Sequence, residues 1–326
     1  MIKNHTLSRP PADLNKDSGR SDVLYLVKGF AIVGVLFAHM SYPSRLQEDT
    51  LLVIHWLQQI FGWCVLAFFF CAGVVAKKVD GFPALKAFME GRFRRLIIPC
   101  LIFTLTYKVL LVVLGKEDLP YGVSGLFWFV FDPVGPQFYF LPYLYGISVL
   151  GALLWLGLGD LMFLAVSISL FFIGVGSMGL ADVGYGKDIE NVPIYFYSYF
   201  LGLMAKQYSG MRLFVMPMVL LPPLLVFLLS GAIVYLYILI PVLMYFLLDC
   251  CKSRDWFSVL ALLGKRSGSI YVWHAPIVMP FVNTVGVKVL GGGLISIVPT
   301  LVVTLALCLA LGWLADQFEG LRLWRF

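Results

Sequence analysis

The sequence predicts an all-α, polytopic integral membrane protein with about ten transmembrane helices and both termini in the cytosol. Three observations predict this fold class: an apolar composition, a series of long apolar stretches, and a one-sided distribution of Lys and Arg. Of the 326 residues, 60% are hydrophobic and only 13% are charged, whereas about 25% of the residues in a soluble domain are charged. So few charges cannot cover a water-facing surface, which excludes a soluble enzyme and leaves little room for an extramembrane domain.

The apolar stretches define the expected helices. A helix needs about 20 apolar residues to cross the hydrocarbon core, and about ten stretches approach this length. The seventh and eighth stretches meet at Ser230 and Gly231 in a very tight connection, so nine or eleven spans are the alternatives. The expected helices cover residues 23–40, 58–76, 95–114, 137–156, 159–177, 193–207, 213–229, 231–247, 269–288 and 293–314.

Lys and Arg gather in every second connecting segment. The segments 77–95 and 252–266 are rich in both, whereas 115–136 and 178–192 hold few of them and are acidic. Because cytoplasmic loops carry an excess of Lys and Arg, the basic segments are expected on the cytosolic side of the cell membrane. The lipid bilayer is then a partner of the protein, and no feature indicates nucleic-acid binding.

The same pattern predicts the domain organisation. Residues 1–22 are polar, basic and contain two prolines, a composition typical of a disordered cytosolic tail. Residues 23–315 are expected to form one transmembrane domain, and residues 316–326 a short cytosolic C-terminal tail. The oligomeric state is not indicated by the sequence.

Two ionisable residues lie within the first apolar stretch, Lys28 and His39. Eleven residues at 100° each come within about 20° of three whole turns, so both side chains are expected on one face, about 16 Å apart along the helix axis. Ionisable residues inside a bilayer are costly and are functional-site candidates by default. The alternatives are a Lys28 side chain that reaches the headgroups and a water-bound His39 at the interface.

Arg92 and Arg95 come just before the third expected helix. Three residues apart on a helix, they share a face. Two guanidinium groups at the cytosolic surface suit a ligand with several phosphate charges. The alternative is attachment to anionic lipid headgroups.

A third group of candidates lies near the start of the ninth expected helix. Lys265 and Arg266 add positive charge at its cytosolic end, and Tyr271 and His274 follow three residues apart on one side. These residues are either the wall of a site or, for the His and Tyr, a structural hydrogen bond between helices.

The longest outer segment, 115–136, contains Trp128 and Asp132 among several aromatic residues. Aromatic faces beside carboxylates suit sugar rings, so both residues are candidates for acceptor binding. An aromatic belt at the membrane interface is an equally good interpretation.

These residues occur in an order that resembles the acyltransferase-3 family of multi-helix membrane O-acyltransferases. The first-helix pattern of a basic residue, ten residues and a histidine is matched by Lys28 and His39. The RxxR motif before the third helix is matched by Arg92 and Arg95. The segments from Phe138 to Leu141, Tyr199 to Gly202 and Ser267 to Ile277 are similar to three further family stretches, with Tyr139 in the place of a tryptophan.

This resemblance implies transfer of an acetyl group from cytosolic acetyl-CoA to a hydroxyl group of a carbohydrate, either a surface polysaccharide or a lipid-linked glycan. It implies that His39 is catalytic and that the donor is held by Lys28, Arg92 and Arg95. Lys265 and Arg266 are further donor candidates, and Tyr139 is an acceptor candidate. Acetyl-CoA would be a co-substrate, and we expect no permanently bound cofactor.

Two other functions are compatible with parts of the sequence. The hydropathy pattern would also suit a transporter or flippase of a glycan or glycolipid, although the half-repeats of such proteins are not evident. A different membrane acyltransferase fold would instead rely on His274 or His55. We expect no metal site, because the four histidines show no metal-ligand spacing.

Overall fold

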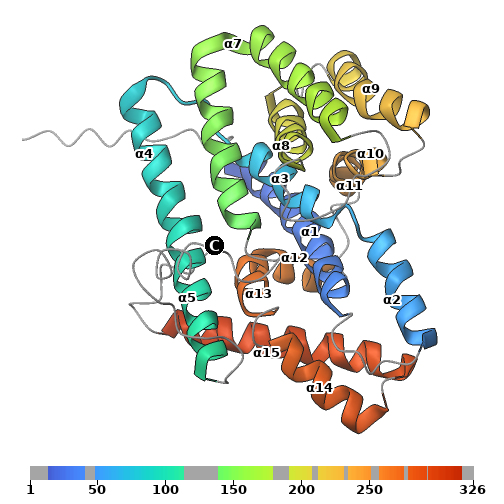
Figure 1. Cartoon of the computed structure of the whole chain (residues 1–326). Helices are drawn as coiled ribbons and strands as arrows, with labels where there is room; N and C mark the ends of the chain where they lie inside the picture. The colour runs from blue at the N-terminus through green and yellow to red at the C-terminus, as the bar shows by residue number, and fades with distance from the viewer. Residues whose placement is uncertain are drawn as a thin grey trace, which may run out of the picture.

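A computed structural model describes residues 14–40, 48–113, 139–178, 191–207, 212–230, 234–250, 257–274, 278–291 and 293–317. Throughout these ranges the chain forms helices and short connections, and none of the described residues lies in a strand (Figure 1). This agrees with the predicted all-α class. The elements are α1 Leu14–His39, α2 Glu48–Ile60, α3 Cys64–Val75, α4 Phe82–Arg92, the π-helix η1 Phe93–Ile97, α5 Ile98–Val113, α7 Phe140–Met178, α8 Val192–Gln207, α9 Arg212–Ser230, α10 Val234–Tyr237, α11 Leu239–Cys250, α12 Ser258–Lys265, α13 Ser267–Trp273, α14 Met279–Leu290, the 3-10 helix η5 Leu294–Ser296 and α15 Ile297–Gln317.

Five helical segments in the described part of the chain are long and apolar enough to cross a membrane. Several shorter apolar helices of 10–17 residues accompany them. The protein is therefore a multi-pass membrane protein, while the total of ten spans and the cytosolic placement of both termini stay predictions. The five long segments are 22–39, 48–75, 82–113, 140–159 and 294–317.

Several expected helices are interrupted. The stretch 58–76 is broken by a turn at 61–63, where α2 ends and α3 begins, and 231–247 is broken at Ile238. The stretches 137–156 and 159–177 correspond to the two arms of α7, which are joined across a kink at the non-helical Gly159, with φ 69°. The predicted division into two helices at this place is therefore confirmed. A positive φ is readily adopted by glycine, which lacks a Cβ. Hydropathy alone does not reveal the breaks at 61–63 and Ile238, because the interrupting residues are themselves apolar or small.

The helix α1 begins at Leu14, inside the segment 1–22 that the sequence predicts to be disordered. A polar sequence can continue a helix beyond the apolar stretch because the backbone hydrogen bonds are the same in water. The remainder of that tail, and residues 318–326, lie outside the described residues.

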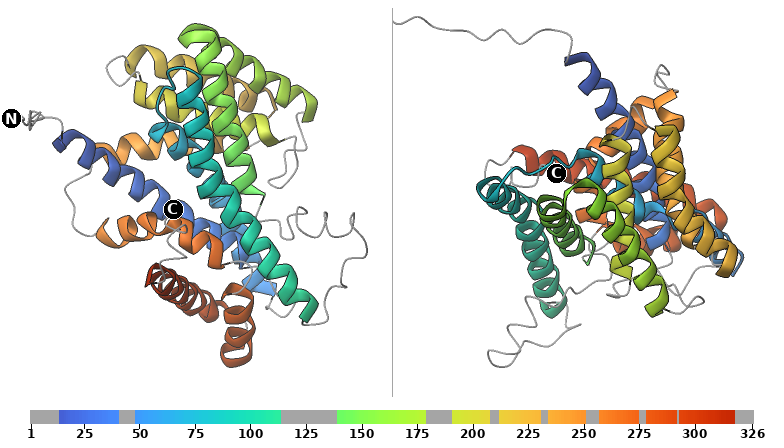
Figure 2. Two further views of the ribbon diagram at one scale, coloured as in Figure 1. Left: turned by 90° about the vertical axis from the view of Figure 1, so that its left-hand side faces the viewer. Right: turned by 90° about the horizontal axis from the view of Figure 1, so that it is seen from above.

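Helices α1 and α3 lie at the centre of the bundle (Figures 1 and 2). The side chains of Leu66, Phe69 and Phe70 on α3 are completely buried. Helix α8 lies along α3 so closely that a Cβ on Gly73 or Gly202 would overlap a backbone carbonyl of the opposite helix. Small residues at such contacts let helix backbones approach, which is a main source of helix association in membranes.

The remaining helices surround this centre. Figure 1 shows α4, η1 and α5 as one long rod on one side, with α7 beside it, and α15 crossing at the opposite end from α9. The short helices α12 and α13 lie between α1 and α15 and contact both through α13. These helices border a space between α1, α3, the end of α4, η1, α7 and the α12–α13 segment.

Candidate active site

A cavity of about 450 Å³ occupies this space. Four of the predicted donor-binding residues line it: Lys28, Arg92, Arg95 and Lys265. No acidic residue is found among the described residues that line the cavity. Four cations without a neighbouring carboxylate form an electropositive chamber that suits a ligand with several negative charges. The volume lies within the range of small-molecule sites in proteins.

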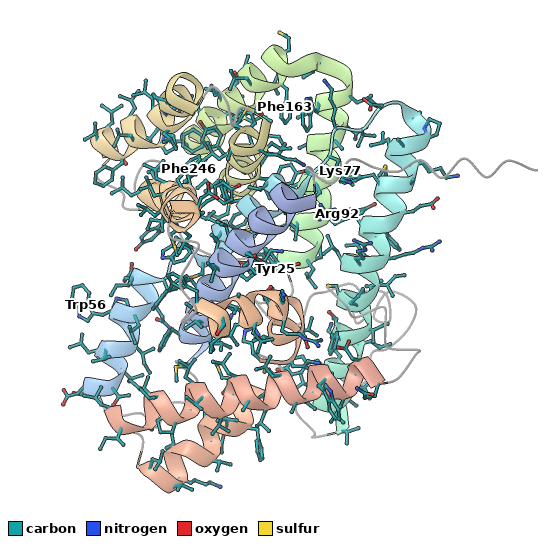
Figure 3. All side chains as sticks on the ribbon, turned by 180° about the vertical axis from the view of Figure 1, so that it is seen from behind. Tyr25, Trp56, Lys77, Arg92, Phe163 and Phe246 are labelled. Carbon is teal, nitrogen blue, oxygen red and sulfur yellow. The ribbon has the colours of Figure 1, made fainter. Side chains whose placement is uncertain are left out.

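Lys28 reaches the cavity from α1. Its side chain is half-buried, and Tyr25, one turn earlier on the same helix face, lines the cavity as well. Sequence reasoning missed Tyr25, although its spacing of three residues from Lys28 could have indicated it. Figure 3 labels Tyr25 and Arg92, which both lie in the interior between α1 and the α4–α5 rod.

The π-helix η1 separates three neighbouring arginines. Arg92 and Arg95 line the cavity, whereas Arg94 lines a different groove of about 370 Å³ between α4 and α7. The widened turn of a π-helix is common at functional sites because it changes the direction of side chains within a continuous helix. Arg92 and Arg95, three residues apart, share the face toward the cavity, as the sequence predicts, and Arg94 points to the groove.

The break between α12 and α13 separates Lys265 from Arg266. Lys265 lines the cavity, and its Nζ lies 5.4 Å from the centre of the Tyr25 ring. Arg266 instead forms an ion pair with Asp316 at the end of α15. The structure therefore does not bring Arg266 to the donor candidates, because the break directs consecutive side chains to different neighbours.

The close fit of α12 against α1 supports this arrangement. A Cβ on Gly264 would overlap the backbone carbonyl of Tyr25, and a Cβ on Gly29 would overlap that of Leu260. Because neither glycine has a side chain, the two helices touch at backbone distance. Lys28 and Lys265 are thereby held on the same border of the cavity.

His39 lies in the last turn of α1, about 16 Å along the axis from Lys28. Its ring faces that of His274, with 5.1 Å between the ring centres and an angle of 52°. His274 follows directly after α13 and is completely buried. Tyr271, three residues earlier, lines the inner part of the cavity and lies 5.7 Å from His274 between ring centres. Tyr271 thus connects the electropositive chamber with the two histidines.

The hydroxyl of Tyr271 and Nε2 of His274 are both enclosed and have no hydrogen-bond partner among the residues that the structure describes. Phe140 packs against the Tyr271 ring with 5.1 Å between the ring centres. A buried polar group without a hydrogen bond is costly. Both atoms are therefore expected to form a hydrogen bond with a ligand or with a neighbouring side chain.

The other candidates lie elsewhere. Tyr139 packs against Tyr143, with 5.5 Å between the ring centres, and is not among the residues that line the cavity. Trp128 and Asp132 lie outside the described residues. His55 is exposed on α2.

No group of three or more His, Cys, Asp or Glu side chains that could hold a metal ion occurs among the described residues. The described residues at this site offer cations and imidazoles. Cations can hold and neutralise phosphate groups, and an imidazole can accept and return a proton near neutral pH.

A comparison with protein families finds one match, which spans residues 23–313 and is described as an acyltransferase domain. No curated protein and no solved structure matches the chain.

Proposed function

The chain belongs to the acyltransferase-3 family, and from this membership we propose that it moves an acetyl group from cytosolic acetyl-CoA to a carbohydrate hydroxyl on the outer side of the cell membrane. Membership makes it a membrane acyltransferase. The donor, the acceptor, the side of the membrane and the roles of individual residues are parts of the proposal.

One observation carries the proposal: Tyr271 lines the cavity with the four cations and lies 5.7 Å from His274 between ring centres, and the His274 ring lies 5.1 Å from that of His39. Neither His39 nor His274 is among the described residues that line the cavity. Acetyl-CoA has several phosphate charges at one end and its thioester at the end of a long arm. Lys28, Arg92, Arg95 and Lys265 would hold the phosphates, and the arm would bring the thioester toward Tyr271 and His39. The distance of about 16 Å along α1 suits a ligand whose charged and reactive parts are far apart.

His39 would act on the acceptor. Its imidazole would take the proton from the acceptor hydroxyl while the oxygen attacks the carbonyl carbon of the thioester. Collapse of the tetrahedral intermediate breaks the carbon–sulfur bond, and the proton on His39 passes to the CoA thiolate. A new ester and free CoA are the products, so atoms and charges balance without an oxidant or a metal.

The test compares membranes that contain the wild-type chain, His39→Ala or His55→Ala. Each receives acetyl-labelled CoA together with glycolipids and polysaccharides extracted from the host. We expect label on a glycan with the wild type and with His55→Ala, and at least a hundredfold slower transfer with His39→Ala, since general acid–base catalysis contributes about 10²–10⁴ in rate. His55 is a matched control because it is an exposed histidine on α2.

Equal labelling with His39→Ala would contradict the catalytic role of His39. If the wild type labels no glycan and releases no CoA, and glycan export depends on the chain, the transporter interpretation replaces acyl transfer.

A further inference from the structure

The hydrogen bonds of His274 determine which of its ring nitrogens carries the proton. Nδ1 lies 2.7 Å from the carbonyl oxygen of Tyr271 and 3.1 Å from that of Ile270. A carbonyl oxygen only accepts hydrogen bonds, so Nδ1 must be the N–H donor. The ring is completely buried, so the neutral form is favoured over a buried charge. Nε2 then carries a lone pair and can only accept.

Nε2 of His274 accepts a hydrogen bond from none of the described residues, although it is enclosed. The ring of His39 is a neighbour of the His274 ring, with 5.1 Å between the ring centres. Centres at this distance allow one N–H···N hydrogen bond between the ring edges after a small rotation of His39. His39 is half-buried in the last turn of α1.

We infer that His274 is a positioning residue that accepts a hydrogen bond from an N–H of His39 at Nε2. This inference rests on the proposed function, in which His39 is the base. The hydrogen bond holds one nitrogen of His39 as the N–H and leaves the other as a lone pair directed at the acceptor hydroxyl. When His39 takes the hydroxyl proton, its N–H toward His274 remains bonded, so the charged ring is stabilised where it forms. A base oriented by a third group is a recurring arrangement in enzymes that act on acyl groups.

If His274 had only a structural role, a substitution that replaces Nδ1 would be tolerated better than one that replaces Nε2. In that case the important bond of His274 is the one from Nδ1 to the Tyr271 carbonyl, within its own helical turn. The two ring nitrogens can be tested separately. The shorter amide of Asn can replace an N–H near Nδ1, whereas the longer amide of Gln can place its oxygen, an acceptor, near Nε2.

The experiment measures kcat, the KM for acetyl-CoA and the thermal unfolding temperature of His274→Gln and His274→Asn in detergent. We expect His274→Gln to keep kcat within about tenfold of the wild type and His274→Asn to lose about a hundredfold, with an unchanged KM for acetyl-CoA in both. A kcat of His274→Asn above that of His274→Gln, or an equal loss of kcat in both variants, would overturn the inference. Wild-type protein without any acyl transfer would overturn the proposed function, a result that is distinct from a wrong order of the two variants.

A second measurement needs no variant to fold. The chain has four histidines, so protein labelled with ¹⁵N-histidine gives few imidazole signals in solid-state NMR. We expect His274 to be protonated at Nδ1 and a through-bond coupling to join Nε2 of His274 to an N–H of His39. Protonation of His274 at Nε2, or the absence of that coupling in active protein, would overturn the inference.

Discussion

Two helix contacts in this bundle are built in the same way and have different surroundings. In the α3–α8 contact, Gly73 and Gly202 each face a backbone carbonyl of the other helix. In the α1–α12 contact, Gly29 and Gly264 do the same. Both contacts depend on the absence of a side chain, so both hold two helices at backbone distance.

Two polar side chains of α8 beside the α3–α8 contact are paired with backbone carbonyls, although α3 itself also lines the cavity through Phe68, Ala72 and Val75. Ser198 donates a hydrogen bond from Oγ to the carbonyl of Leu66 at 2.9 Å, and Lys206 donates from Nζ to the carbonyl of Ala76 at 2.7 Å. Polar groups near this contact therefore find partners within the protein. The contact serves the cohesion of the core.

The surroundings of the α1–α12 contact are open. Lys28 and Lys265 lie on either side of it and line the cavity together with two arginines. The comparison shows that the same glycine-mediated contact between two helices can lie within a packed core or can hold charged residues at the border of a cavity. What differs is the other side of the helices: α8 is covered by α7, whereas α12 leaves space beside α1.

The largest effect, on the KM for acetyl-CoA, is expected when the arginines of the cavity lose their charge. The double substitution Arg92→Gln and Arg95→Gln should raise the KM for acetyl-CoA about a hundredfold, since hydrogen bonds to charged groups contribute about 1.5–3 kcal/mol each. A donor titration measures this change. Arg94→Gln is the matched control, because Arg94 lies in the neighbouring groove, and its KM should stay near that of the wild type. An unchanged KM for acetyl-CoA in the double variant would contradict the role of this cavity in donor binding. The α1–α12 and α3–α8 contacts would then not differ in function.

Alanine at the glycines distinguishes the two contacts directly. Gly202→Ala and Gly264→Ala should each destabilise the protein by about 1–3 kcal/mol, because the new methyl group forces backbones apart. Only Gly264→Ala should also raise the KM for acetyl-CoA, as it moves Lys265 away from Lys28.

Thermal unfolding and donor titration of both variants provide the measurement. Gly146→Ala is the control, since a Cβ there meets nothing within 4 Å. A raised KM in Gly202→Ala of the same size as in Gly264→Ala would show that the two contacts are not functionally separate.

The smallest effect is expected within the α3–α8 contact. Ser198→Ala removes the hydrogen bond to Leu66 and should cost about 0.6 kcal/mol, the average for such bonds between membrane helices. The unfolding temperature should fall slightly, with kcat and KM unchanged. A clear loss of activity at normal stability would connect the α3–α8 contact to the site and would contradict the assignment of that contact to the core alone.

The expected helices 193–207 and 213–229 closely match α8, Val192–Gln207, and α9, Arg212–Ser230. These helices could be predicted because an uninterrupted apolar stretch with polar ends is a local property of the sequence. The breaks at 61–63 and Ile238 could not, because apolar residues on both sides conceal the change of direction.

The site divides in the same way. The sequence by itself determined the membrane class, the helical fold and the shared face of Lys28 and His39, since these follow from composition and from the 3.6-residue period of one helix. Only the tertiary structure decided that His274 faces His39, that Arg94 and Arg266 lie outside the cavity, and that Gly264 brings α12 against Tyr25. The reason is physical: the helical period sets which residues share a face, while the packing of distant segments sets what that face meets.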